Sequence, residues 1–108
     1  MKYEKLFTPG KLGNMTVKNR IVMPPMGTGM AAADGEANDQ IIRYYEERAK
    51  GGCGLIITEI TRVDEQYGWG LARQLAVTKP GMINGLQKLV DTVHKYGTKI
   101  LVQLHHPG

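Results

Sequence analysis

The feature that most constrains this chain is a short, uninterrupted apolar run, Leu55–Ile57, which follows a cluster of glycines at 51–54. A strand with one solvent-facing side alternates apolar and polar residues, whereas a strand covered on both faces has a continuous apolar sequence. The run therefore predicts a strand of a parallel sheet that is buried on both sides. We expect this strand to continue to Ile60.

A helix is predicted before this strand, over about residues 39–50. Asn38 or Asp39 can cap its N-terminus, because a short polar side chain can accept the hydrogen bond of a free backbone N–H there. The glycine pair at 51–52 supplies the stop at its C-terminus. One apolar face repeats at helical spacing, formed by Ile41, Tyr45 and Ala49.

A second helix and a third strand are predicted after a long polar loop over about residues 62–77. Pro80 stands near the start of the helix and Gly97 ends it. The third parallel strand is Lys99–Leu104. The apolar stripe of the helix comprises Met82, Leu86, Leu89 and Val93, joined by Ile83 and Val90.

A hairpin and a first strand are predicted near the N-terminus. Gly13-Asn14 suits a two-residue turn, because both residues tolerate positive φ, and Lys11–Leu12 and Met15–Val17 flank it. The strand Arg20–Met23 follows and is ended by Pro24-Pro25, because proline cannot donate a hydrogen bond within a sheet.

The order hairpin, β, α, β, α, β predicts an α/β fold with a parallel sheet. These signals do not separate an open, doubly wound sheet from a closed barrel. Three strands cannot close a barrel, for which about 250 residues are typical. No helix follows the third strand, so we expect an uncovered sheet edge and face, and a chain that is a fragment or pairs with something else.

Composition excludes several classes of protein. The single cysteine, Cys53, excludes an internal disulfide and favours a reducing cytoplasm, and we expect it to pack as a small buried residue. No apolar run approaches the roughly 20 residues of a membrane span. The 14 basic and 10 acidic residues are interspersed, so the net charge of +4 forms no patch that predicts nucleic-acid binding.

Candidate ligand-binding residues share one position in the predicted fold. Pro25-Met26-Gly27, Ile60 and Gln103 all fall at the C-terminal ends of predicted parallel strands, where α/β folds bind their ligands. The backbone N–H of Gly27 can donate to a ligand, because a glycine lets a planar ligand approach closely. The amide of Gln103 can donate and accept, which suits the edge of a heterocycle, although it could equally satisfy a neighbouring strand or loop.

Two other motifs do not predict a site. The sequence Gly27-Thr28-Gly29 follows a strand but lacks the third glycine of a dinucleotide-binding fingerprint. His105 and His106 are adjacent, so in extended chain they point to opposite faces, and we expect no metal site there.

Four segments resemble the N-terminus of the old yellow enzyme family. They are Lys5–Pro9, Leu12–Met26, Gly54–Glu59 and Gln103–Gly108, and the resemblance covers nearly the whole chain. The Pro-Pro-Met-Gly-Thr-Gly and His-His-Pro-Gly sequences are most similar to those of the larger bacterial enoate and 2,4-dienoyl-CoA reductases and the bile-acid-inducible flavoenzymes.

The resemblance implies that residues 1–108 are the N-terminal part of a (β/α)₈ TIM barrel that binds FMN at its C-terminal face. The part present would be the bottom hairpin, about three strands and two helices, so the chain is expected to be truncated relative to the family. By the same resemblance, the cofactor-binding residues are Pro24, Pro25, Met26 and Gly27 around the flavin, Ile60 as a further contact, and Gln103 hydrogen-bonded to the pyrimidine edge.

Gly27 departs from the pattern of the family. Other members carry Thr or Cys at this position, and a relative links FMN covalently through the cysteine. With glycine, covalent attachment at this position is ruled out and only backbone donation is left.

The chemistry implied is hydride transfer from NADH or NADPH to FMN, and then to an activated C=C such as that of an enone, enoate or enoyl thioester. The groups that polarise and protonate the substrate lie beyond the third strand in the family, so we assign no catalytic residue. A 4Fe-4S cluster and FAD are expected only in a longer parent chain, and the enzyme is expected to be a homo-oligomer. The alternative is a non-catalytic half-barrel that needs partner chains and does not bind flavin stably.

Overall fold

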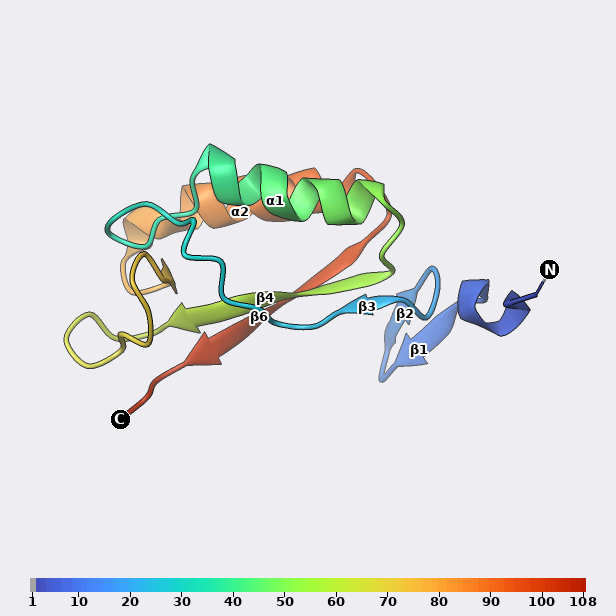
Figure 1. Cartoon of the computed structure of the whole chain (residues 1–108), viewed down its shortest axis with the longest axis horizontal. Coiled ribbons are helices and arrows are strands. Elements are labelled where there is room, and N and C mark those ends of the chain that lie inside the picture. The colour runs from blue at the N-terminus through green and yellow to red at the C-terminus, as the bar shows by residue number, and fades with distance from the viewer. Residues whose placement is uncertain (1) are drawn as a thin grey trace.

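The computed structural model describes residues 2–108 and consists of a parallel sheet with both helices on one of its faces (Figure 1). In chain order the elements are η1 (Glu4–Phe7), β1 (Gly10–Leu12), β2 (Met15–Val17), β3 (Val22–Met23), α1 (Asp39–Lys50), β4 (Leu55–Arg62), β5 (Leu75–Ala76), η2 (Pro80–Met82), α2 (Ile83–His94) and β6 (Lys99–His105).

Strand β4 is the centre of the sheet, and all of its partners run parallel to it. β6 pairs along its whole length, with a bulge between Ile57 and Ile60. The other edge of β4 is shared by β3 at its start and the short strand β5 at its end. The predicted parallel strand is thus confirmed and extends to Arg62, whereas β5 lies inside the segment predicted to be a loop.

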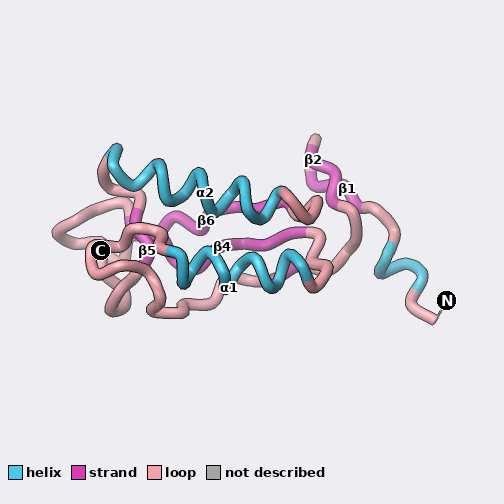
Figure 2. The backbone as a smooth tube through the Cα atoms, turned by 90° about the horizontal axis from the view of Figure 1, so that it is seen from above, coloured by secondary structure: helices cyan, strands magenta, loops and turns pink. Residues whose placement is uncertain are grey.

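Both predicted helices are confirmed, and they cover one face of the sheet (Figure 2). Asn38, rather than Asp39, is the N-cap of α1, because its side chain accepts the N–H of Ile41 at 3.0 Å. The chain leaves α1 through Gly52, at φ +110°. The core between helices and sheet includes Tyr45, Ile56, Leu89 and Val93.

One predicted core residue is wrong. Ile83 was expected in the apolar stripe of α2, but its side chain is 58% exposed. The stripe assumes α-helical spacing through Met82, but Met82 belongs to the 3₁₀-helix η2, which turns more tightly than an α-helix. Met82 is the one that is buried.

The β1–β2 hairpin forms as predicted, with Gly13 at φ +59° in its turn. It lies at the end of the sheet where β4 and β6 begin, opposite to the end toward which their arrows point (Figure 1). The hairpin is therefore remote from the loops that follow the strands.

The face of the sheet opposite the helices is uncovered in the part of the chain that the structure describes (Figure 1). On β6 the side chain of Leu101, which alternates with the helix-facing Ile100 and Val102, is 44% exposed on this face. This outcome agrees with the expected uncovered edge and face. Within residues 2–108, neither helix has the length and apolar character needed to cross a bilayer.

Candidate functional site

The candidate residues lie at the end of the sheet where the parallel strands finish. Ile60 on β4 and Gln103 on β6 are direct partners in the strand register, so their side chains lie side by side on the same face. Met23, the last residue of β3, pairs with Ile56, and Thr28, which follows Gly27, is hydrogen-bonded to Glu59, the residue before Ile60. The structure therefore brings the segment 24–27, Ile60 and Gln103 to one rim.

This rim is open, and its polar groups are free of partners among residues 2–108. Pro24, Met26 and Gly27 are exposed, Pro25 is half-buried, and the backbone N–H of Gly27 donates no hydrogen bond. The side-chain amide of Gln103 is exposed and makes no hydrogen bond within this part of the chain. Both roles predicted for Gln103, contact with a ligand and contact with a neighbouring strand or loop, stay predictions.

The absence of a side chain at Gly27 has a local explanation. A β-carbon on Gly27 would lie 2.9 Å from Cδ2 of Leu71, which belongs to the loop after β4. Leu71 therefore fills the space that a side chain at position 27 would occupy. The next residue, Thr28, is tied to β4 by its hydroxyl, which lies 3.0 Å from each carboxylate oxygen of Glu59.

A second polar group at the rim was not predicted. The amide oxygen of Gln74 accepts the N–H of Gly70 at 2.6 Å and that of Leu71 at 3.3 Å. This orients its NH₂ group toward Nδ1 of His105, 3.2 Å away. Nδ1 is then the acceptor, so the proton of the neutral imidazole is on Nε2. Gln74 stands in a polar loop, where no local pattern distinguishes it from its neighbours.

Arg62 is the other residue that was missed, although it is fully buried at the end of β4. Its guanidinium donates to the carbonyl oxygens of Gln74 at 2.8 Å and Asp34 at 2.6 Å, and it stacks 3.6 Å above the ring of Trp69. Its Nε has no partner. Arg62 thus joins the loop after β3 to the loop after β4. Extending the strand from Ile60 to Arg62 would have placed it at the rim.

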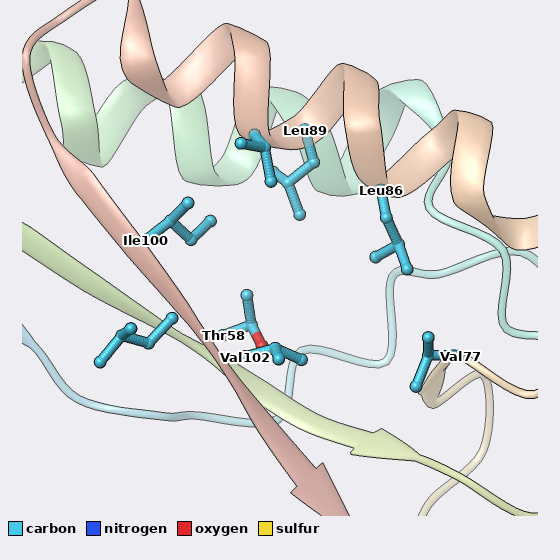
Figure 3. A pocket seen from close by; sticks show the side chains of 8 residues that line it. Thr58, Val77, Leu86, Leu89, Ile100 and Val102 are labelled. Atoms are coloured by element: carbon cyan, nitrogen blue, oxygen red, sulfur yellow. The ribbon is translucent and has the colours of Figure 1, made fainter.

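An apolar hollow lies elsewhere, between α2 and the helix-facing side of the sheet (Figure 3). It measures about 220 Å³ and offers almost no polar group. It therefore does not provide the hydrogen bonds that a heterocycle with several polar atoms needs. Its lining includes Thr58, Val77, Leu86, Leu89, Ile100 and Val102.

Cys53, His94 and His106 lie outside the candidate site. Cys53 is half-buried and packs against the core, in partial agreement with the packing role expected of it. His94 and His106 are exposed. Within residues 2–108, His, Cys, Asp and Glu side chains do not gather in a group that could hold a metal ion.

Several known proteins are similar to this chain. The NADH oxidase of Thermoanaerobacter brockii is 44% identical over 106 residues, which are 98% of this chain and 16% of that protein. An NADPH dehydrogenase of Listeria monocytogenes is 42% identical over 105 residues, covering 96% of this chain and 31% of that protein. The chain thus spans between about a sixth and a third of the length of these relatives.

The solved structures that are similar to this chain include old yellow enzymes. The Old Yellow Enzyme from Pichia sp. AKU4542 is 35% identical, with a TM-score of 0.88 over 96% of this chain and 27% of that one. The old yellow enzyme from Trypanosoma cruzi is 37% identical, with a TM-score of 0.88 over 100% of this chain and 28% of that one. The predicted resemblance is confirmed, and the fold is that of part of an Old Yellow Enzyme barrel. A family profile matches residues 5–108, and the chain belongs to the NADH:flavin oxidoreductase / NADH oxidase family.

Proposed function

We propose that residues 1–108 are the N-terminal part of an FMN-binding (β/α)₈ barrel domain in an NAD(P)H-dependent flavin oxidoreductase. Family membership supports the flavin and the nicotinamide. The uncovered face of the sheet supports a larger barrel, because exposed apolar side chains such as Leu101 are normally covered by further parts of the protein.

The observation that carries this proposal is the common rim of Gly27, Ile60 and Gln103. Ile60 and Gln103 are register partners, and Gly27 lies in the segment after β3, where the next residue, Thr28, is hydrogen-bonded to Glu59 beside Ile60. Ligands of barrels bind at this C-terminal end of the strands. The hydrogen-bonding groups of the rim are also unpaired within the described residues, as a binding site requires.

The residues present fit the edge of a flavin. The Gln103 amide would donate to one and accept from another of the alternating C=O and N–H groups of the pyrimidine edge. The Gly27 N–H would donate to the ring system, while Pro24, Pro25, Met26 and Ile60 would provide apolar contacts to it. These residues would bind and orient FMN, which supplies the hydride-accepting and hydride-donating chemistry when bound.

For the substrate, we propose a small molecule with an activated C=C, such as an enoate or enoyl thioester. A relative named cinnamate reductase, from Clostridium sporogenes, supports this class, because it is 38% identical over 107 residues and cinnamate is an α,β-unsaturated carboxylate. The carbonyl-polarising donors and the proton donor would come from parts of the barrel beyond β6.

We further propose that the complete protein belongs to the longer class of relatives. The chain covers 16% of the NADH oxidase but 31% of the NADPH dehydrogenase, so the first is about twice as long, and it is also the more similar. The additional length would leave room for a 4Fe-4S cluster and FAD. We also propose that the complete protein is a homo-oligomer.

The test is the absorbance spectrum of the complete protein, followed by anaerobic titration with NADH and then with cinnamate. We expect a flavin spectrum that NADH bleaches and cinnamate restores. Replacing Gln103 with Leu should weaken FMN binding about tenfold, as expected for one hydrogen bond at the ring edge. The matched control is Gln87→Leu on the exposed side of α2, which should bind FMN normally. A colourless protein would favour the non-catalytic half-barrel instead.

A further inference from the structure

A carboxylate without solvent contact stands next to a rim residue, because Glu59 directly precedes Ile60 on β4 and contacts Tyr45 of α1. Glu59 is fully buried, and both of its oxygens accept hydrogen bonds from within the chain. The hydroxyl of Tyr45 donates to Oε2 at 2.8 Å, and the hydroxyl of Thr28 lies 3.0 Å from each oxygen. The backbone N–H of Thr28 adds a longer hydrogen bond of 3.4 Å to Oε1. All of these groups are donors, which is the pattern around an ionised carboxylate.

The hydrogen bonds of Tyr45 show that its hydroxyl donates to the Glu59 carboxylate. Its hydroxyl oxygen accepts the backbone N–H of Glu59 at 2.9 Å, so its single proton is directed at the carboxylate. Burial raises the pKa of the Tyr45 hydroxyl far above its usual range, and the negative charge of Glu59 raises it further. The hydroxyl is therefore a donor throughout the neutral pH range.

The charge of Glu59 has no counter-ion among residues 2–108. The ion pairs there involve Glu65 and Asp39, and no Lys, Arg or His lies within 4.0 Å of the Glu59 carboxylate. Burying a carboxylate without a counter-ion is costly, and such groups gather at functional sites more than elsewhere. Here Glu59 directly precedes the rim residue Ile60, and its hydrogen-bond partner Thr28 directly follows the rim residue Gly27.

On the basis of the flavin site proposed above, we propose that Glu59 is a positioning residue that also lowers the reduction potential of the bound flavin. Through Thr28 it fixes the backbone of Gly27, whose N–H is free to donate to the ring. Two-electron reduction adds negative charge to the flavin ring. A fixed negative charge nearby opposes that addition, because solvent screens the buried Glu59 carboxylate only weakly.

The charge is tested with Glu59→Gln in the complete protein, which keeps the shape of the side chain and removes its charge. The measurement is the two-electron potential of bound FMN, by anaerobic titration against a reference dye. We expect the ratio of reduced to oxidised FMN at a fixed potential to rise about tenfold, equivalent to an upward shift of about 30 mV. Glu47→Gln, on the exposed side of α1, is the matched control and should leave the potential unchanged. A Glu59→Gln protein that binds FMN with the wild-type potential would overturn the inference.

The positioning role is tested separately at Thr28, which also covers the case in which Glu59→Gln does not fold. Thr28→Val removes the hydroxyl and should weaken FMN binding about tenfold, whereas Thr28→Ser keeps it and should bind FMN like wild type. Equal FMN affinity for the two variants would contradict the positioning role. Absence of flavin from the unmodified protein is a different result, because it would overturn the proposed function itself.

Discussion

Replacing Gly35 with alanine should destabilise the protein much more than the same replacement at Gly52. Both glycines have positive φ, +94° and +110°, which L side chains rarely adopt. They differ in the space around them. A β-carbon on Gly35 would lie 2.6 Å from Nη1 of Arg62 and from Cβ of Ala76, and 2.7 Å from the carbonyl oxygen of Gln74, whereas nothing lies within 4 Å at Gly52.

The magnitude follows from two terms. The unfavourable φ costs about 1–3 kcal/mol at either position. Overpacking adds about 1–3 kcal/mol, and it applies only at Gly35, where backbone and a buried guanidinium would have to move. We therefore expect Gly52→Ala to lower the free energy of unfolding by about 1–3 kcal/mol, and Gly35→Ala by about 1–3 kcal/mol more.

The assay is urea unfolding of the complete protein and of both variants, followed by circular dichroism, together with the dissociation constant for FMN. Because Arg62 joins the loops at the rim, Gly35→Ala should also weaken FMN binding, and Gly52→Ala should not. An equal loss of stability in the two variants would refute the packing argument around Arg62.

Three further predictions concern the helices. Asn38→Ala removes the N-cap of α1 and should lower the free energy of unfolding by about 1 kcal/mol in urea; no loss would mean that the cap is unimportant. Leu89→Ala opens a cavity in the core and should cost about 2–5 kcal/mol in the same assay, whereas a loss under 1 kcal/mol would show that α2 packs differently. Lys88 holds the pKa of Asp39 below its usual range, by a hydrogen bond and then by its charge. Because the folded-state pKa is the lower one, this stabilisation is present above about pH 4 and is lost as the pH falls further. The stability difference between wild type and Asp39→Asn should therefore shrink on acidification, and a constant difference would contradict the assignment.

The elements that the sequence predicts correctly depend on local signals. The cap, the apolar face and the glycine stop of α1 all lie within about 15 residues of one another, and each acts on the backbone next to it. The same holds for the hairpin around Gly13 and for the continuous apolar start of β4. Each of these features forms where the local residues indicate.

The features that were missed depend on contacts between distant parts of the chain. Strand β5 exists because Leu75 and Ala76 pair with the end of β4. Gln74 is ordered by His105, 31 residues later. Glu46 on α1 accepts a hydrogen bond of 2.9 Å from the hydroxyl of Tyr96, which stands 50 residues later in the chain. Local sequence patterns do not predict such distant partners, because several other residues in the chain could form the same kind of contact.

The sequence predicts where the candidate site lies, but not the buried residues that hold its loops in place. The sequence indicates where each parallel strand ends, and this is sufficient to predict that Gly27, Ile60 and Gln103 lie at the same end of the sheet. The burial of Glu59 and Arg62 could not, because both are charged residues that ordinarily stay exposed. Their partners, Thr28 and Asp34 among them, come from the loop after β3.

A crystal structure of the complete protein with FMN would test the central proposal most directly. We predict that the Gly27 N–H and the Gln103 amide both lie within hydrogen-bonding distance, about 2.7–3.2 Å, of the flavin ring, with Ile60 against its face or edge. Flavin bound beside the β1–β2 hairpin, or in the apolar hollow beneath α2, with Gln103 facing solvent, would contradict it.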